Sequence, residues 1–133
     1  MNFGAWHELT DASHTAPDEP GVLQARAETL RAYPRGKSAM VYYGGSDDTE
    51  SLRGYVSGRG VLGLEGAATA GARFVRFGVT RHPQLELARL LGRFLARFGA
   101  APLANDSETS KGNGKGEGKG EGKGEGKGMT GDV

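Results

Sequence analysis

Three side chains that could carry chemistry stand in separate segments of this sequence. Tyr42 lies in "SAMVYYGGS", Arg53 in "TESLRGYVS", and Glu86 near the start of "PQLELARLLGRFLARFG". A tyrosine hydroxyl can move a proton when its environment lowers its pKa, and the guanidinium of an arginine keeps its positive charge in proteins. A single carboxylate can hold a hard cation such as Mg²⁺ or Mn²⁺, which keeps most of its waters. Whether these three groups act together depends on the elements that carry them.

Each of the three also has a purely structural interpretation. Glu86 would sit in the first turn of a helix, where an ion pair with Arg89 or Arg93 and the helix dipole together contribute about 1 kcal/mol. A lone arginine on a helix is usually a surface residue, and a tyrosine usually belongs to the core or its rim. Arg53 gains a role in chemistry only if it points to the same pocket as Glu86 and a tyrosine at a strand end.

Periodicity predicts the elements that must position these groups. "GVLQAR" is expected to form a short strand, followed by a connection with turn residues at Pro34 and Gly36. The nearly continuous apolar run over 39–43 predicts a strand covered on both faces, and hence a central one. Alternation over 73–79 predicts a third strand.

Two helices are expected. The segment 49–57 predicts a short helix capped by Thr49, and the Gly- and Ala-rich segment after it is expected to be a loop with at most a turn of helix. The clearest helix covers 83–98, where leucines and phenylalanines form a full apolar stripe. Pro83 suits its first position and Gly99 its end.

Composition excludes several classes of protein. The chain has no cysteine, which excludes a disulfide framework and a cysteine-based zinc site, and its three histidines lack ligand spacing. Its start lacks the pattern of a signal peptide, and no apolar stretch is long enough to span a membrane. We therefore expect a cytoplasmic protein that does not enter a membrane.

The net charge of +1 hides an uneven distribution. Between Gly66 and Asn105 there are six arginines and one acid, Glu86. A positive end of the domain would suit nucleic acid, although a solvated arginine face explains the same pattern. The arginines that we expect to contact nucleic acid are Arg73, Arg76, Arg89 and Arg93.

The chain divides into three parts by composition. Residues 1–19 form a polar lead-in, 20–106 a folded domain, and 107–133 a tail in which Gly alternates with Lys and Glu. Such a tail has no apolar surface to offset the backbone entropy lost on folding, so we expect a disordered spacer.

The order of these motifs resembles the GIY-YIG nuclease superfamily over about 20–105. "PGVLQAR" is similar to the first strand of the family, and "MVYYGG" to the second, with Tyr42 and Gly44 as its Y-x-G. Arg53 matches the helix arginine of the family, Glu86 its metal-binding glutamate, and Asn105 in "PLAN" its closing asparagine.

This resemblance implies a small α/β (α+β) fold, with a three-stranded antiparallel sheet flanked by helices. It also implies a metal-dependent DNA endonuclease. Glu86 would hold Mg²⁺ or Mn²⁺, Arg53 would bind the scissile phosphate, Tyr42 would activate or position the water, and Asn105 would belong to the DNA-binding set.

The sequence departs from the family at its first motif, where Leu23 replaces a tyrosine and cannot handle a proton. Acidic residues at Asp47, Asp48 and Glu50 would also repel a phosphate near Arg53. The alternative is therefore a related domain that has little or no cleavage activity and binds nucleic acid or a protein partner. A protein-interaction domain that recruits its partner through the acidic loop or the tail is a further hypothesis.

Overall fold

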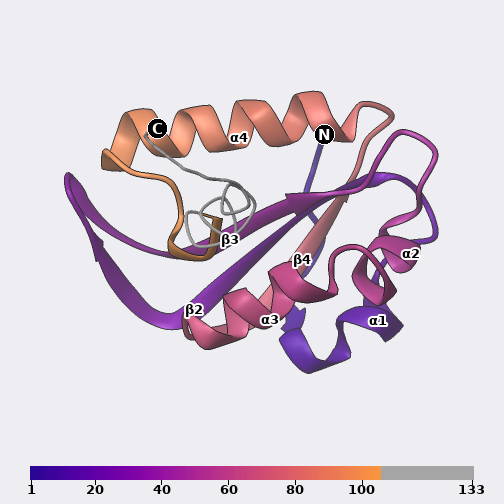
Figure 1. The fold of residues 1–133 in the computed structure, drawn as a ribbon, viewed down its shortest axis with the longest axis horizontal. Coiled ribbons are helices and arrows are strands. Elements are labelled where there is room, and N and C mark those ends of the chain that lie inside the picture. Colours follow the sequence, from indigo (N-terminus) through magenta and orange to yellow (C-terminus); the bar gives the residue numbers. More distant parts are fainter. Residues whose placement is uncertain (106–133) are drawn as a thin grey trace, which may run out of the picture.

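An antiparallel sheet separates two helical layers (Figure 1). The computed structural model describes residues 1–105, so the predicted tail at 107–133 lies outside the described residues. The elements are, in order, β1 (His7–Glu8), η1 (Leu9–Asp11), α1 (Ala12–Thr15), β2 (Gly21–Tyr33), β3 (Gly36–Gly45), α2 (Leu52–Ser57), α3 (Val61–Thr69), β4 (Ala72–Val79) and α4 (Pro83–Phe98).

The predicted antiparallel sheet flanked by helices is confirmed, but over the described part of the chain it has four strands rather than three. The strand order is β1-β4-β2-β3. The extra strand comes from the polar lead-in, where His7 and Glu8 pair with Val75 and Phe74 of β4. Two residues are too short to give a period, so the sequence carried no signal for β1.

β3 is an edge strand, and the prediction that it would be central is wrong. The central strand is β2, which pairs with β3 on one side and with β4 on the other. β3 is nevertheless buried from Val41 to Gly45, because helices cover both of its faces. An apolar run therefore reports two covered faces, and it does not report the position of a strand within the sheet.

Two clusters of buried side chains hold the layers together. On one face of the sheet Leu23, Tyr42 and Val75 pack against Leu52 and Val56 of α2, and against α1 and α3. On the other face Tyr33 and Tyr43 pack against Phe94 of α4. Because Tyr42 and Tyr43 are consecutive in a strand, they point to opposite faces and enter different clusters.

Several boundaries differ from the predicted ones. β2 and β3 continue far beyond the expected short strands and meet at the turn predicted at Pro34 and Gly36. α2 is capped by Ser51, whose Oγ accepts from the Gly54 amide at 3.0 Å, and not by Thr49. The segment expected to be a loop contains the helix α3.

The long helix α4 follows the sequence prediction at both ends. It starts at Pro83, and Gly99 ends it in the left-handed region with φ of 82°. No helix among residues 1–105 is long and apolar enough to cross a membrane.

Two glycines give opposite predictions for stability. A Cβ at Gly21 would overlap the carbonyl of Gly78 where β2 and β4 approach, whereas a Cβ at Gly66 in α3 would meet nothing within 4 Å. We expect Gly21→Ala to lower the free energy of unfolding by about 2 kcal/mol or more. Gly66→Ala should raise it by about 0.5 to 1 kcal/mol through helix propensity. Urea denaturation of both variants checks the pair, and equal effects would contradict it.

Candidate functional site

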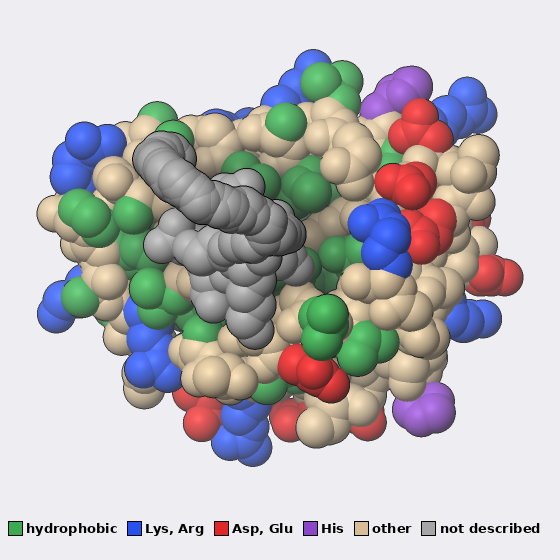
Figure 2. Space-filling model, in the orientation of Figure 1, with side chains coloured by type: hydrophobic (Ala, Val, Ile, Leu, Met, Phe, Trp, Pro, Cys, Tyr) green, Lys and Arg blue, Asp and Glu red, His purple; other side chains and the backbone are tan. Residues whose placement is uncertain are grey.

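A pocket of about 390 Å³ opens along the free edge of β3. Its floor is the end of that strand, from Tyr42 to Gly45, and its two walls come from the helical layers on either side of the sheet. We call this pocket the edge slot. Figure 2 shows the hollow, with hydrophobic side chains inside it and acidic side chains gathered beside one rim.

One wall of the edge slot is a flank of α4. It carries the aliphatic side chains of Leu87, Leu91 and Leu95, the amide of Gln84, and Gly92. A Cβ built at Gly92 would meet no atom of residues 1–105 within 4 Å, so this glycine widens the slot. The flank is therefore mainly apolar, with one polar side chain at its N-terminal end.

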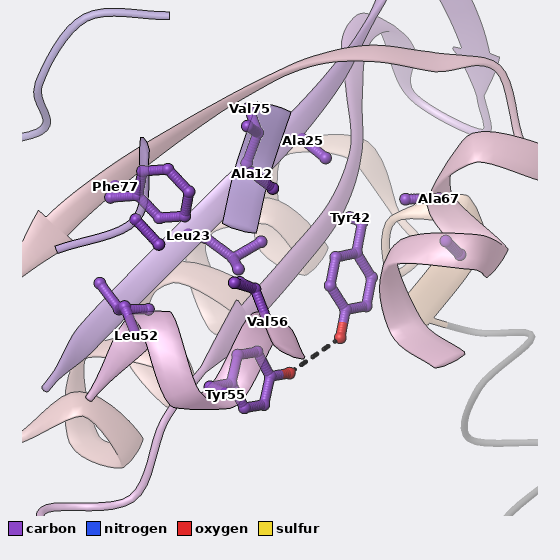
Figure 3. Close-up of a cluster of buried hydrophobic side chains, with 12 residues drawn as sticks. Ala12, Leu23, Ala25, Tyr42, Leu52, Tyr55, Val56, Ala67, Val75 and Phe77 are labelled. Atoms are coloured by element: carbon purple, nitrogen blue, oxygen red, sulfur yellow. Dashed lines mark hydrogen bonds between the residues drawn. The ribbon is translucent and has the colours of Figure 1, made fainter. Parts of the chain in front are cut away.

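The opposite wall contains a pair of tyrosine hydroxyls. Tyr42 Oη and Tyr55 Oη lie 3.2 Å apart, and both side chains are buried (Figure 3). The pair needs the glycine at position 44, since a Cβ there would come within 3.0 Å of both hydroxyl oxygens. Gly44 is thus required for the packing of this wall, whatever else it does.

Arg59 is the arginine that lines the edge slot. Its guanidinium lies 5.0 Å from the centre of the Tyr55 ring and binds Glu50 at 2.8 Å and Asp47 at 3.4 Å. The hydrogen bond from Arg59 lowers the pKa of the Glu50 carboxyl. The charge of Arg59 is therefore already matched by carboxylates, which disfavours a bound phosphate here.

The structure brings only one of the three predicted catalytic side chains to this slot. Tyr42 lines it, whereas Arg53 projects from α2 and donates from Nε to the Ala16 carbonyl at 3.2 Å. Glu86 pairs with Arg89 at 3.2 Å. At about 100° per residue, the nine positions between Glu86 and Leu95 place them about 180° apart around α4. Glu86 thus belongs to the flank of α4 opposite the slot.

The residues of the edge slot do not fit a divalent cation. None of the described residues that line it is a carboxylate, and residues 1–105 contain no group of three or more His, Cys, Asp or Glu suited to hold a metal ion. Protein sites for Mg²⁺ are usually built around one or two carboxylates, and the carboxylate of Glu86 is engaged by Arg89 instead.

Asn105, predicted to contact nucleic acid, closes the edge of β3. Its Oδ1 accepts from the Tyr43 amide at 2.9 Å, and its Nδ2 donates to the Tyr43 carbonyl at 2.8 Å. The buried side chain satisfies both outward backbone groups of Tyr43, as a neighbouring strand would. A structural role therefore accounts for this residue.

A second feature lies on the α4 side of the sheet, across β2 and β4. Arg76 donates from Nε to Gln24 Oε1 at 2.7 Å, and its guanidinium lies 4.5 Å from the Trp6 ring centre. Arg26 lies over the same ring at 4.8 Å, and its buried Nε has no hydrogen-bond partner among the described residues. Burial lowers the pKa of Arg76, and the charge of Arg26 adds to this.

The flank of α4 opposite the slot extends this cationic surface. Arg89, Arg93 and Arg97 recur every four residues on α4 and therefore share one flank. Both Arg76 and Arg93 lie close enough to Tyr43 to act on its pKa. We call the combined surface the arginine face. Its arginines are Arg26, Arg76, Arg89, Arg93 and Arg97.

Arg73 is not part of the arginine face. It binds Glu28 at 2.9 Å and Glu8 at 3.6 Å, so two carboxylates offset its charge. By contrast, none of Arg26, Arg76 and Arg93 has an ion-pair partner within the part of the chain that the structure describes.

Sequence reasoning missed several residues that line the slot. Arg59 follows the predicted helix in a glycine-rich stretch where no period indicates a direction. Gln84, Gly92 and Leu95 could have been grouped, because helical spacing places them on one flank of α4. No sequence signal identified Tyr55 as the partner of Tyr42.

Comparisons of the chain with protein-family models, with curated proteins and with solved structures give no match. The geometry of the edge slot and of the arginine face must therefore carry the functional argument.

Removing the amide of Asn105 tests its role at the sheet edge. Asn105→Ala leaves two buried backbone groups of Tyr43 without partners, so we expect the free energy of unfolding to fall by about 2 to 4 kcal/mol. Leu103→Ala, an exposed change two residues away, should stay within about 0.5 kcal/mol. Urea denaturation gives both values, and a neutral Asn105→Ala would disprove the edge-closing role.

The Tyr43 hydroxyl predicts an alkaline loss of stability. Burial raises its pKa to about 12 from the ordinary 10.0. The unfolded chain therefore loses this proton first. The contribution of this group to the free energy of unfolding is fully present below pH 10 and falls as the pH rises towards 12. We expect this group to account for a loss of about 2 to 3 kcal/mol. Tyr43→Phe should flatten this part of a plot of stability against pH, and an unchanged slope would contradict the assignment.

Proposed function

We propose that this chain is a nucleic-acid-binding domain of GIY-YIG-like architecture that binds phosphate groups without hydrolysing them. The observation that carries the proposal is the arginine face. Arg26, Arg76 and Arg93 have no carboxylate partner among residues 1–105. Arg26 lies over the ring of Trp6, and Arg76 lies over the rings of Phe3 and Trp6.

The chemistry of this face suits a nucleic-acid backbone. Guanidinium groups bind phosphate oxygens through planar, bidentate hydrogen bonds, and each phosphate neutralised releases condensed counterions. Arg76 and Arg26 are held in place by Gln24 and Trp6, so binding requires little further ordering of these side chains. The partly exposed rings of Phe3 and Trp6 add surface on which bases can stack.

The same observations weigh against hydrolysis. The predicted tyrosine, arginine and glutamate do not share a pocket, and the described residues that line the slot of Tyr42 include no carboxylate. Arg59, the cation of that slot, is paired with Glu50 and Asp47. Binding through the arginine face therefore accounts for the described residues better than metal-dependent cleavage does.

Salt-dependent binding to a fluorescent DNA oligonucleotide tests the arginine face. We expect Arg93→Gln and Arg76→Gln each to weaken binding several-fold and to reduce the slope of log K against log salt by about 1. Arg53→Gln is the matched control, since it removes the same charge from α2 on the opposite side of the sheet. Equal losses in all three variants would indicate a net-charge effect and would contradict a specific face.

Cleavage is tested separately with supercoiled plasmid. The binding proposal predicts that the DNA stays intact with Mg²⁺ or Mn²⁺ present. Nicking that disappears in folded Arg53→Ala and Glu86→Ala variants would overturn the non-hydrolytic proposal and support the endonuclease hypothesis instead.

A further inference from the structure

We propose that the edge slot is a second binding site, which takes an uncharged, planar heteroaromatic molecule carrying a ring N–H. The inference rests on the lining of the slot alone and does not depend on nucleic-acid binding. The arginine face and the slot lie on opposite flanks of α4, so they can be tested separately.

The shape of the slot favours a flat ligand. It continues the plane of the sheet beyond β3, with the leucines of α4 above this plane and Tyr42 and Tyr55 below it. A ring lying in that plane would contact aliphatic groups on one side and phenol rings on the other. The volume of about 390 Å³ lies within the range of small-molecule sites.

The charge of the slot favours an uncharged ligand. Among the described residues that line it, Arg59 is the charged one, and its guanidinium binds Glu50 and Asp47 at the rim. An anion would approach those two carboxylates, and a cation would approach the guanidinium. A neutral ligand avoids both like-charge repulsions. Covering the apolar surface of the leucine wall also contributes favourable free energy to binding.

Gln84 supplies the group that selects a ring N–H. Its Nε2 donates to the carbonyls of Ser46 at 3.0 Å and Gly45 at 3.3 Å, which fixes the side-chain amide at the mouth of the slot. None of the described residues donates to its Oε1. A ligand N–H that reaches this oxygen would donate a hydrogen bond to it. Because the amide is already held in place, it loses little conformational entropy on binding.

Titration of the ¹⁵N-labelled chain with indole tests the proposal. We expect saturable shifts of the amide signals of Gly44, Gly45 and Gly92. Benzofuran, which has the same ring shape but no N–H, should bind several-fold more weakly, and inorganic phosphate should not shift these signals. Shifts that map to other residues, no shifts at all, or equal affinity for benzofuran would overturn the proposal.

Substitutions that change the volume of the slot test the site further, with a matched control outside it. Gly92→Leu places a side chain in the open space of the slot and should weaken indole binding at least tenfold, whereas Gly66→Leu adds the same side chain to α3 and should leave it unchanged. Leu95→Ala, at a half-exposed position, shortens the leucine wall and should weaken binding several-fold even if Gly92→Leu fails to fold. Full affinity in folded Gly92→Leu or in Leu95→Ala would refute the site.

Discussion

The closure of the free edge of β3 is the constraint on which the rest of this structure depends. This strand is buried on both faces but has no neighbouring strand on one side within residues 1–105, so its outward backbone groups need other partners. Asn105 satisfies Tyr43, while Gln84 and Arg59 both donate to the Gly45 carbonyl. Three side chains from different segments thereby converge on one strand, and the space left between them is the edge slot.

The long elements could be predicted from the sequence because each of their patterns is compatible with only one type of secondary structure. The stripe from Leu87 to Phe98, with Pro83 before it and Gly99 after it, defines α4 at both ends. The alternation in β4 and the apolar run of β3 define strands. What these patterns cannot give is the strand order. Both a central strand and a doubly covered edge strand produce the same run of apolar residues.

The candidate site was harder to predict, because it depends on directions around helices and on side-chain pairing. Arg53 and Glu86 were grouped with Tyr42 by their order along the chain. The flank that Glu86 occupies was already determined by its spacing from Arg89 and Arg93, which favoured an ion pair. Arg59 and Tyr55 gave no comparable signal. The helix α2 is short and its connection is rich in glycine, so neither shows a repeat of apolar residues that would indicate a direction. A match of residue types in order therefore says less about a site than the helical flank on which each residue lies.

The helix α4 divides the surface into two chemically different regions. Its buried stripe packs on Tyr33 and Tyr43, which fixes the rotation of the helix about its own axis. This rotation turns Gly92 and Leu95 towards the slot and Arg93 and Arg97 away from it. Because the arginines face away, the leucine wall stays uncharged and the cationic surface stays free of the carboxylates at Glu50 and Asp47. One packing interaction thus produces both an apolar slot and a cationic face within a domain of about a hundred residues.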